Sequence, residues 1–209
     1  MRTISSAMGG CLLLLIAGTT QAEWSANIGF ASDYYFRGVF QGSSSASGGV
    51  DFEENGFYAG TWAAQVGEGN GNGLEVDAYF GYAGEIDDIS YSLGYTGYFY
   101  TGDFDDTYQE ISLGGGYGVL TLDLAVGQYE AFDAPTLDYV YYAVTLEKNG
   151  FYGRYAGFSR DFDGAYFELG YGTSVAGIDV GIAVISSNDD LVGQSEESLV
   201  FTIGKTFDL

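Results

Sequence analysis

Histidine is absent from the 209-residue sequence, and cysteine and proline each occur only once. Without histidine, no imidazole is available as a general base or as a metal ligand. Lysine and arginine together number 6 against 29 aspartate and glutamate residues, so the formal charge is −23. This shortage of positive charge excludes a protein that neutralises a run of nucleic-acid phosphates.

Glycine and aromatic residues are abundant instead, with 34 Gly, 19 Tyr and 15 Phe. The chain is 46% hydrophobic and 17% aromatic, which argues against a disordered, solvated chain. Gly, Tyr and Phe are poor helix formers, so a helical domain is disfavoured. The composition therefore predicts a β-rich protein with many tight turns.

The first 22 residues have the pattern of a secretory signal peptide. Arg2 supplies a positive start, an apolar run covers 11–17, and small residues surround the expected cleavage site after Ala22. The run is well short of the roughly 20 residues that a spanning helix needs. Cys11 begins this run instead of following it, which does not fit a lipid-attachment site. We expect a single domain at 23–209 without cysteine, and closure of a sheet on itself is one way to stabilise such an exported chain.

Alternation of apolar with small or polar residues continues through this whole domain. In 74–82, for example, Leu74, Val76 and Phe80 share one face, and Glu75 and Asp77 share the other. Twelve segments follow the pattern, and they are approximately 24–37, 45–52, 57–66, 74–83, 89–100, 107–117, 119–129, 137–146, 151–160, 165–172, 178–185 and 198–209.

The connections between these segments alternate in length, as in outer-membrane barrels with short periplasmic turns and longer outside loops. The short ones are 53–56, 84–88, 118, 147–150 and 173–177, and the longer or more polar ones are 38–44, 67–73, 101–106, 130–136, 161–164 and 187–197. Aromatic residues recur near the segment ends, as interfacial girdles require. We predict an all-β, antiparallel, up-and-down transmembrane barrel of twelve strands, with ten or fourteen as alternatives. A secreted soluble β-sandwich stays open, because parity alone does not say which face is inside.

The final segment, Leu199 to Leu209, resembles the terminal strand by which the barrel-assembly machinery recognises its substrates. That signal usually ends in an aromatic residue, whereas here Leu209 is last and Phe207 lies two residues before it. Lys205 falls on the apolar parity, so its side chain is expected to snorkel or to lie at a bulge. The expected partners are this machinery, outer-membrane lipid and lipopolysaccharide, in the cell outer membrane. The sequence does not indicate an oligomeric state.

Three stretches resemble the TorF family of porins, long catalogued as outer-membrane proteins of unknown function. They are 32–39 (SDYYFRGV), 49–52 (GVDF) and 55–63 (NGFYAGTWA). The resemblance is strongest over 31–66 and extends toward the C-terminus. It implies an outer-membrane barrel and passive transport, and it brings no catalytic residues.

If the apolar faces meet lipid, the opposite parity places a set of charged side chains inside the barrel. These candidate pore-lining residues are Arg37, Asp51, Glu75, Asp77, Asp123, Arg154, Glu168 and Asp179. A lumen lined by carboxylates attracts cations and repels anions. We therefore expect a narrow, weakly cation-preferring channel for small polar solutes. The alternative is a plugged structural barrel in which the same charges form closed salt bridges.

Enzymatic, cofactor and metal functions are not expected. The familiar outer-membrane hydrolases and acyltransferases rely on histidine, and inner carboxylates two residues apart are simply the lumen-facing set. The acidic stretches 103–106 and 188–190 do not have the spacing of an EF-hand loop and are expected to be solvated. The glycine-rich stretch 67–73 lacks the residues of a phosphate-binding loop.

Overall fold

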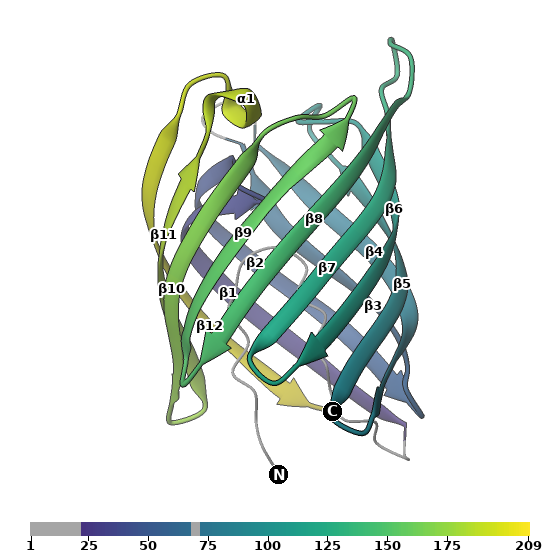
Figure 1. Cartoon of the computed structure of the whole chain (residues 1–209), viewed down its shortest axis with the longest axis vertical. Helices are drawn as coiled ribbons and strands as arrows, with labels where there is room; N and C mark the ends of the chain where they lie inside the picture. Colours follow the sequence, from purple (N-terminus) through teal and green to yellow (C-terminus); the bar gives the residue numbers. More distant parts are fainter. Residues whose placement is uncertain (1–21, 68–71) are drawn as a thin grey trace.

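The computed structural model describes residues 22–67 and 72–209. The expected signal peptide lies outside the described residues except for its last residue, Ala22. Twelve antiparallel strands form one closed barrel in which each strand pairs with its sequence neighbours and β1 pairs with β12 (Figure 1). The strands are β1 (Glu23–Phe36), β2 (Val39–Glu54), β3 (Phe57–Val66), β4 (Gly73–Ile86), β5 (Ile89–Tyr100), β6 (Thr107–Tyr117), β7 (Leu120–Glu130), β8 (Leu137–Lys148), β9 (Phe151–Arg160), β10 (Ala165–Val175), β11 (Ile178–Ser187) and β12 (Glu196–Asp208). The predicted strand number is confirmed.

Two-residue turns connect the strands at the end of the barrel where β1 begins and β12 ends, which is the lower end in Figure 1. At three of them both residues have positive φ, namely Asn55-Gly56, Asn149-Gly150 and Ala176-Gly177. This conformation matches the right-handed twist of paired strands, and Asn-Gly is its preferred sequence. The opposite end carries the longer connections, including the short helix α1 (Asp189–Val192) between β11 and β12. Within the part of the chain that the structure describes, no helix is long and apolar enough to cross a membrane.

Large apolar side chains cover the outside of the barrel. Ile111 is 56% exposed and Phe80 is 54% exposed, and the same parity recurs on the other strands. Tyrosines and acidic residues occupy the inner face, where Tyr98, Glu75 and Asp77 are almost completely buried. Water would disfavour so large an apolar exterior, whereas the hydrocarbon interior of a bilayer accepts it. The barrel is therefore built to span a membrane.

Lys205 interrupts this apolar exterior near the lower end of β12. It pairs in regular register with Ile28, so the structure has no bulge there. Its ammonium group lies 5.0 Å from the centre of the Phe207 ring, on the outside of the barrel. Of the two expectations for Lys205, the structure fits a side chain that extends along the surface.

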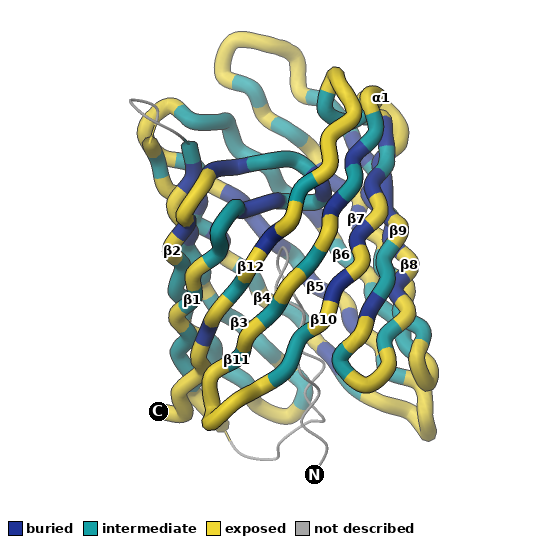
Figure 2. The backbone as a smooth tube through the Cα atoms, turned by 90° about the vertical axis from the view of Figure 1, so that its left-hand side faces the viewer, coloured by how far each residue is buried: buried dark blue, intermediate teal, exposed yellow. Residues whose placement is uncertain are grey.

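The stretch 38–44 differs from its predicted conformation. It was expected to be a long external loop, but the connection is only Arg37-Gly38, and β2 already begins at Val39. The pairing of β1 with β12 extends along β1 only as far as Ala31, and the pairing of β2 with β3 starts only at Ser47. Residues 32–46 therefore form a hairpin that pairs with itself and leaves the wall. Figure 2 shows buried stretches of the chain crossing the barrel near the end that carries α1.

Candidate functional site

The inward-folded hairpin, residues 32–46, narrows the lumen and is the centre of the candidate site. The pairing of β1 with β2 has a register shift between Tyr34 and Tyr35, partway along the hairpin. The turn residue Gly38 has φ +81°, and a Cβ atom there would lie 2.6 Å from Cγ of Tyr166 on β10. Its carbonyl oxygen accepts a hydrogen bond from the Ser187 hydroxyl on β11. Glycine is required at the tip both for backbone conformation and for close approach to the opposite wall.

Arg37 fixes the tip of the hairpin to the far side of the barrel. Its guanidinium donates two hydrogen bonds to the Glu110 carboxylate, at 2.8 and 2.7 Å. Glu110 lies on β6, five strands from β1 by one route round the barrel and seven by the other. The same carboxylate accepts hydrogen bonds from the hydroxyls of Tyr98 (3.0 Å) and Tyr139 (2.9 Å). A bidentate pair of this kind is both strong and geometrically specific.

Aromatic rings hold the Arg37 guanidinium in place. Its central carbon lies 4.0 Å from the ring centre of Tyr141 and 5.0 Å from that of Phe36. The Tyr141 and Tyr166 hydroxyls are 3.0 Å apart. The hairpin therefore contacts side chains from several strands of the wall and is not a free loop.

A second buried network lies on β8, β9 and β10. Arg154 donates from Nε to the Thr145 hydroxyl (3.1 Å), and its guanidinium lies 3.7 Å from the Glu168 carboxylate. The Tyr152 hydroxyl also donates to Glu168. Arg154 shares its face of β9 with Tyr152, Ala156 and Phe158, and the structure places this face inside the barrel.

All eight residues predicted to line the lumen lie on the inner parity of their strands or, for Arg37, at the tip of the inserted hairpin. Asp51 accepts hydrogen bonds from Asn27 (3.1 Å) and from the Tyr79 hydroxyl. Asp123 and Asp179 are partly buried. The structure brings Arg37 near Glu75 and Asp77, and it brings Arg154 to Glu168.

Glu75 and Asp77 occupy the most buried position of the set. They are 0% and 1% exposed, and they lie two residues apart on β4. One Glu75 oxygen accepts a hydrogen bond from the Tyr34 hydroxyl at 2.9 Å. Among the described residues, the other Glu75 oxygen and Asp77 Oδ1 are buried without a hydrogen-bond partner.

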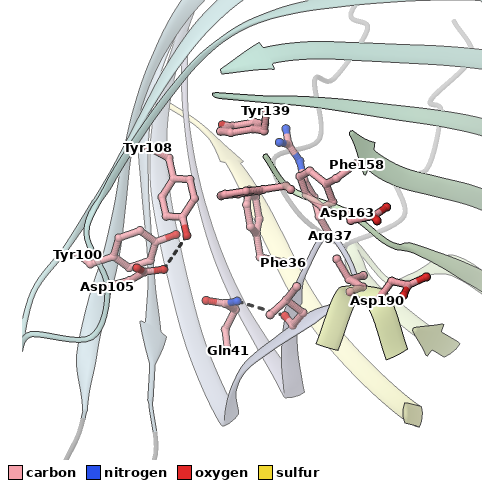
Figure 3. Close-up of a pocket in the computed structure, with 13 residues that line it drawn as sticks. Phe36, Arg37, Gln41, Tyr100, Asp105, Tyr108, Tyr139, Phe158, Asp163 and Asp190 are labelled. Carbon is pink, nitrogen blue, oxygen red and sulfur yellow. Dashed lines mark hydrogen bonds between the residues drawn. The ribbon is translucent and has the colours of Figure 1, made fainter. Parts of the chain in front are cut away.

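A cavity of about 300 Å³ opens above the hairpin, toward the end with α1 (Figure 3). Aromatic side chains make up much of its lining, and the Arg37 side chain also lines it. Asp105 accepts a hydrogen bond from the Tyr108 hydroxyl at 3.0 Å, and Asp163 and Asp190 also line the cavity. The cavity is therefore a vestibule of aromatic and acidic character.

Glu110 was missed among the sequence-predicted residues. Its partners Tyr98 and Tyr139 belong to the aromatic residues near the segment ends that are expected in interfacial girdles, but the structure buries both inside the barrel, where they donate to Glu110. The signal was present, because Glu110 shares the small-residue face of the predicted strand 107–117 with Ser112 and Gly114. Nothing local identified it as the partner of Arg37, 73 residues away.

Comparisons with known proteins agree with the barrel. A family model described as a bacterial protein of unknown function (Gcw_chp) matches residues 16–207. No curated protein matches the chain. A structure solved in work on the in-meso crystallization of membrane proteins is 10% identical, with a TM-score of 0.55, and the match covers 90% of this chain and 84% of that one.

Two further solved structures are more distant. Acinetobacter baumannii OccAB3 is 12% identical, with a TM-score of 0.43, and the match covers 87% of this chain and 60% of that one. Pseudomonas aeruginosa OccK2 (OpdF), solved in complex with glucuronate, is 13% identical, with a TM-score of 0.41, and coverage of 86% and 62%. The chain thus spans about three fifths of these two proteins. Of the three likenesses, the first shows a shared fold.

Proposed function

The chain belongs to the Gcw_chp family of bacterial proteins of unknown function, and we propose that it is a passive channel of the outer membrane. In this proposal small polar solutes cross the barrel through its lumen, with a weak preference for cations. The inserted hairpin forms the narrowest part of the path. The resemblance of residues 32–39 and 55–63 to the TorF porins supports the same function, and membership of that family is part of the proposal.

The observation that carries the cation preference is the charge of the inner face. The predicted lining contains six carboxylates and two guanidinium groups, and Glu110 adds a seventh carboxylate. A low-dielectric wall focuses the field of such an excess along the lumen. Cations are therefore concentrated in the channel and anions are repelled.

A specific observation also favours a second candidate, a plugged structural barrel. The bidentate Arg37–Glu110 pair and the contacts of Gly38 hold the hairpin across the lumen. If the hairpin never leaves, the charges around it serve stability instead of transport. Barrels of this size lie between small filled barrels and open porins, so size alone does not decide.

Recordings from planar bilayers that contain the purified protein distinguish the two candidates. The channel proposal expects discrete conductance steps and a reversal potential, under a salt gradient, shifted toward that of the cation. A clear anion preference would contradict it. Discrete steps that are absent from the native chain but present in a variant with a released hairpin would favour the plugged barrel.

We propose that the exterior of the barrel and its last strand bind the partners expected from the sequence. Lipid and lipopolysaccharide contact the apolar face, and the barrel-assembly machinery recognises Leu199 to Leu209. We propose no enzymatic activity, since the inner carboxylates are accounted for by the lining of a polar lumen.

A further inference from the structure

Among the described residues, Glu75 and Asp77 are the ones whose buried side-chain oxygen atoms lack a hydrogen-bond partner. Both carboxylates are almost fully buried on the inner face of β4. Among the described residues, no group donates a hydrogen bond to the second Glu75 oxygen or to Asp77 Oδ1. Burying an ionised carboxylate is costly unless it is paired or bound to a cation. An unsatisfied buried carboxylate therefore calls for a partner.

The residues that pair with Glu75 and Asp77 on the two neighbouring strands are uncharged. On β3, Ala64 pairs with Glu75 and Trp62 with Asp77; on β5, the corresponding residues are Tyr100 and Tyr98. The Tyr34 ring contacts that of Trp62, with ring centres 5.8 Å apart, so the hairpin covers this corner.

The hydrogen bonds of the buried arginines are directed to other residues than Glu75 and Asp77. Arg37 directs both of its hydrogen bonds from the terminal nitrogens to Glu110. Arg154 donates to Thr145 and lies beside Glu168 on the other network. The two carboxyl groups therefore lie together beneath the hairpin without a hydrogen bond from either arginine.

We infer that Glu75 and Asp77 bind one small divalent cation of the hard, oxygen-preferring class, such as Ca²⁺ or Mg²⁺. Side chains two residues apart on a strand share a face about 7 Å apart, so two carboxylates can turn toward one ion between them. Carboxylate, hydroxyl and water oxygens are the ligands that such ions prefer. Two carboxylates match a charge of two, which favours a divalent over a monovalent ion.

The ion keeps part of its water shell at this site. Within the described ranges no group of three or more His, Cys, Asp or Glu side chains forms a metal-binding cluster, so the protein supplies only part of the coordination. Partial coordination allows release, as a stopping point for a permeating cation requires. The inference thus adds a cation-binding site to the proposed channel. Only the role of this site in transport rests on the proposed function.

Terbium luminescence in detergent solution tests the site directly. Tb³⁺ replaces Ca²⁺ at oxygen sites, and a nearby tryptophan sensitises its emission. The chain has two tryptophans: Trp62 pairs with Asp77 across β3 and β4, while Trp24 is exposed on the outside of β1. With excitation at the red edge of the tryptophan band, where the neighbouring tyrosines do not absorb, we expect sensitised emission from the native barrel and from Trp24→Phe, and loss of most of it in Trp62→Phe.

The double variant Glu75→Gln/Asp77→Asn should also lose most of the emission, while the matched variant Asp87→Asn/Asp88→Asn, in the exposed turn between β4 and β5, should keep it. Ca²⁺ should displace Tb³⁺ far more effectively than K⁺ at equal ionic strength. Emission that persists in the double variant, or displacement by K⁺ as effective as by Ca²⁺, would overturn the inference.

Heat-modifiable gel migration verifies that each variant is folded, and Asp77→Asn alone replaces the double variant if that one fails to fold. Because binding is measured without conduction, this test is independent of the bilayer recordings. Absence of channels would count against the proposed function and leave the binding result standing.

Discussion

Replacing Arg37 by methionine removes the clamp that holds the hairpin in the lumen. The substitution keeps an unbranched side chain against Tyr141 but deletes both hydrogen bonds to Glu110. Glu110, with a side chain 2% exposed, then remains as a buried carboxylate without its cation. Breaking a buried ion pair in this way typically costs about 3–5 kcal/mol. The Tyr98 and Tyr139 hydroxyls still donate to Glu110, so we expect a loss of about 3 kcal/mol in the free energy of unfolding.

Urea unfolding in lipid vesicles, followed by tryptophan fluorescence, measures this loss. The double variant Arg37→Met/Glu110→Gln removes the orphaned charge and should recover about 2 kcal/mol of it. The control is Arg160→Met, because the Arg160–Asp138 pair is 3.7 Å apart with both side chains about half exposed. An exposed pair of this kind is worth at most about 1 kcal/mol.

The same variant should change conduction. When the inserted conformation of the hairpin alone loses about 3 kcal/mol of stability, the equilibrium between the inserted and released conformations shifts about a hundredfold toward the released one. Arg37→Met should therefore open more often, or to a larger conductance, than the native channel in planar bilayers. The reasoning would be refuted if Arg37→Met unfolded at the same urea concentration as Arg160→Met, or if its conductance matched that of the native protein.

Two other substitutions test separate parts of the account. Gly38→Ala should destabilise the barrel more than Gly177→Ala, in the same urea assay: both positions have positive φ, but only a Cβ atom at Gly38 meets Tyr166, whereas nothing lies within 4 Å at Gly177. Strain of the backbone alone costs on the order of 1 kcal/mol, and equal losses would contradict the close packing of the hairpin tip. Asp51→Asn/Asp179→Asn should reduce the ratio of cation to anion permeability in bilayers, and an unchanged reversal potential would show that these inner carboxylates do not set selectivity.

Much of the barrel is specified locally, which is why it could be predicted from the sequence. The alternation in 74–82 alone places Leu74 and Phe80 outside and Glu75 and Asp77 inside. The pairs Asn55-Gly56 and Asn149-Gly150 mark tight turns through their own backbone preferences. Strand number and inner face follow from such features without knowledge of any distant contact.

The hairpin could not be predicted, because its conformation depends on residues far along the chain. The stretch 38–44 is rich in glycine and serine and is typical of a loop. It becomes strand because Tyr34 reaches Glu75, Arg37 reaches Glu110 and Ser187 reaches Gly38. The small residues that suggested a loop are also those that fit inside a narrow barrel.

The orientation of the two faces is the central claim, and the two native tryptophans test it most directly. Trp24 lies on the outer parity of β1 and is 53% exposed, whereas Trp62 lies on the inner parity of β3 against Tyr34. In vesicles of brominated lipid, Trp62→Phe, which retains Trp24, should lose most of its fluorescence by quenching. Trp24→Phe, which retains Trp62, should stay bright. Strong quenching of Trp62 with protection of Trp24 would contradict the account.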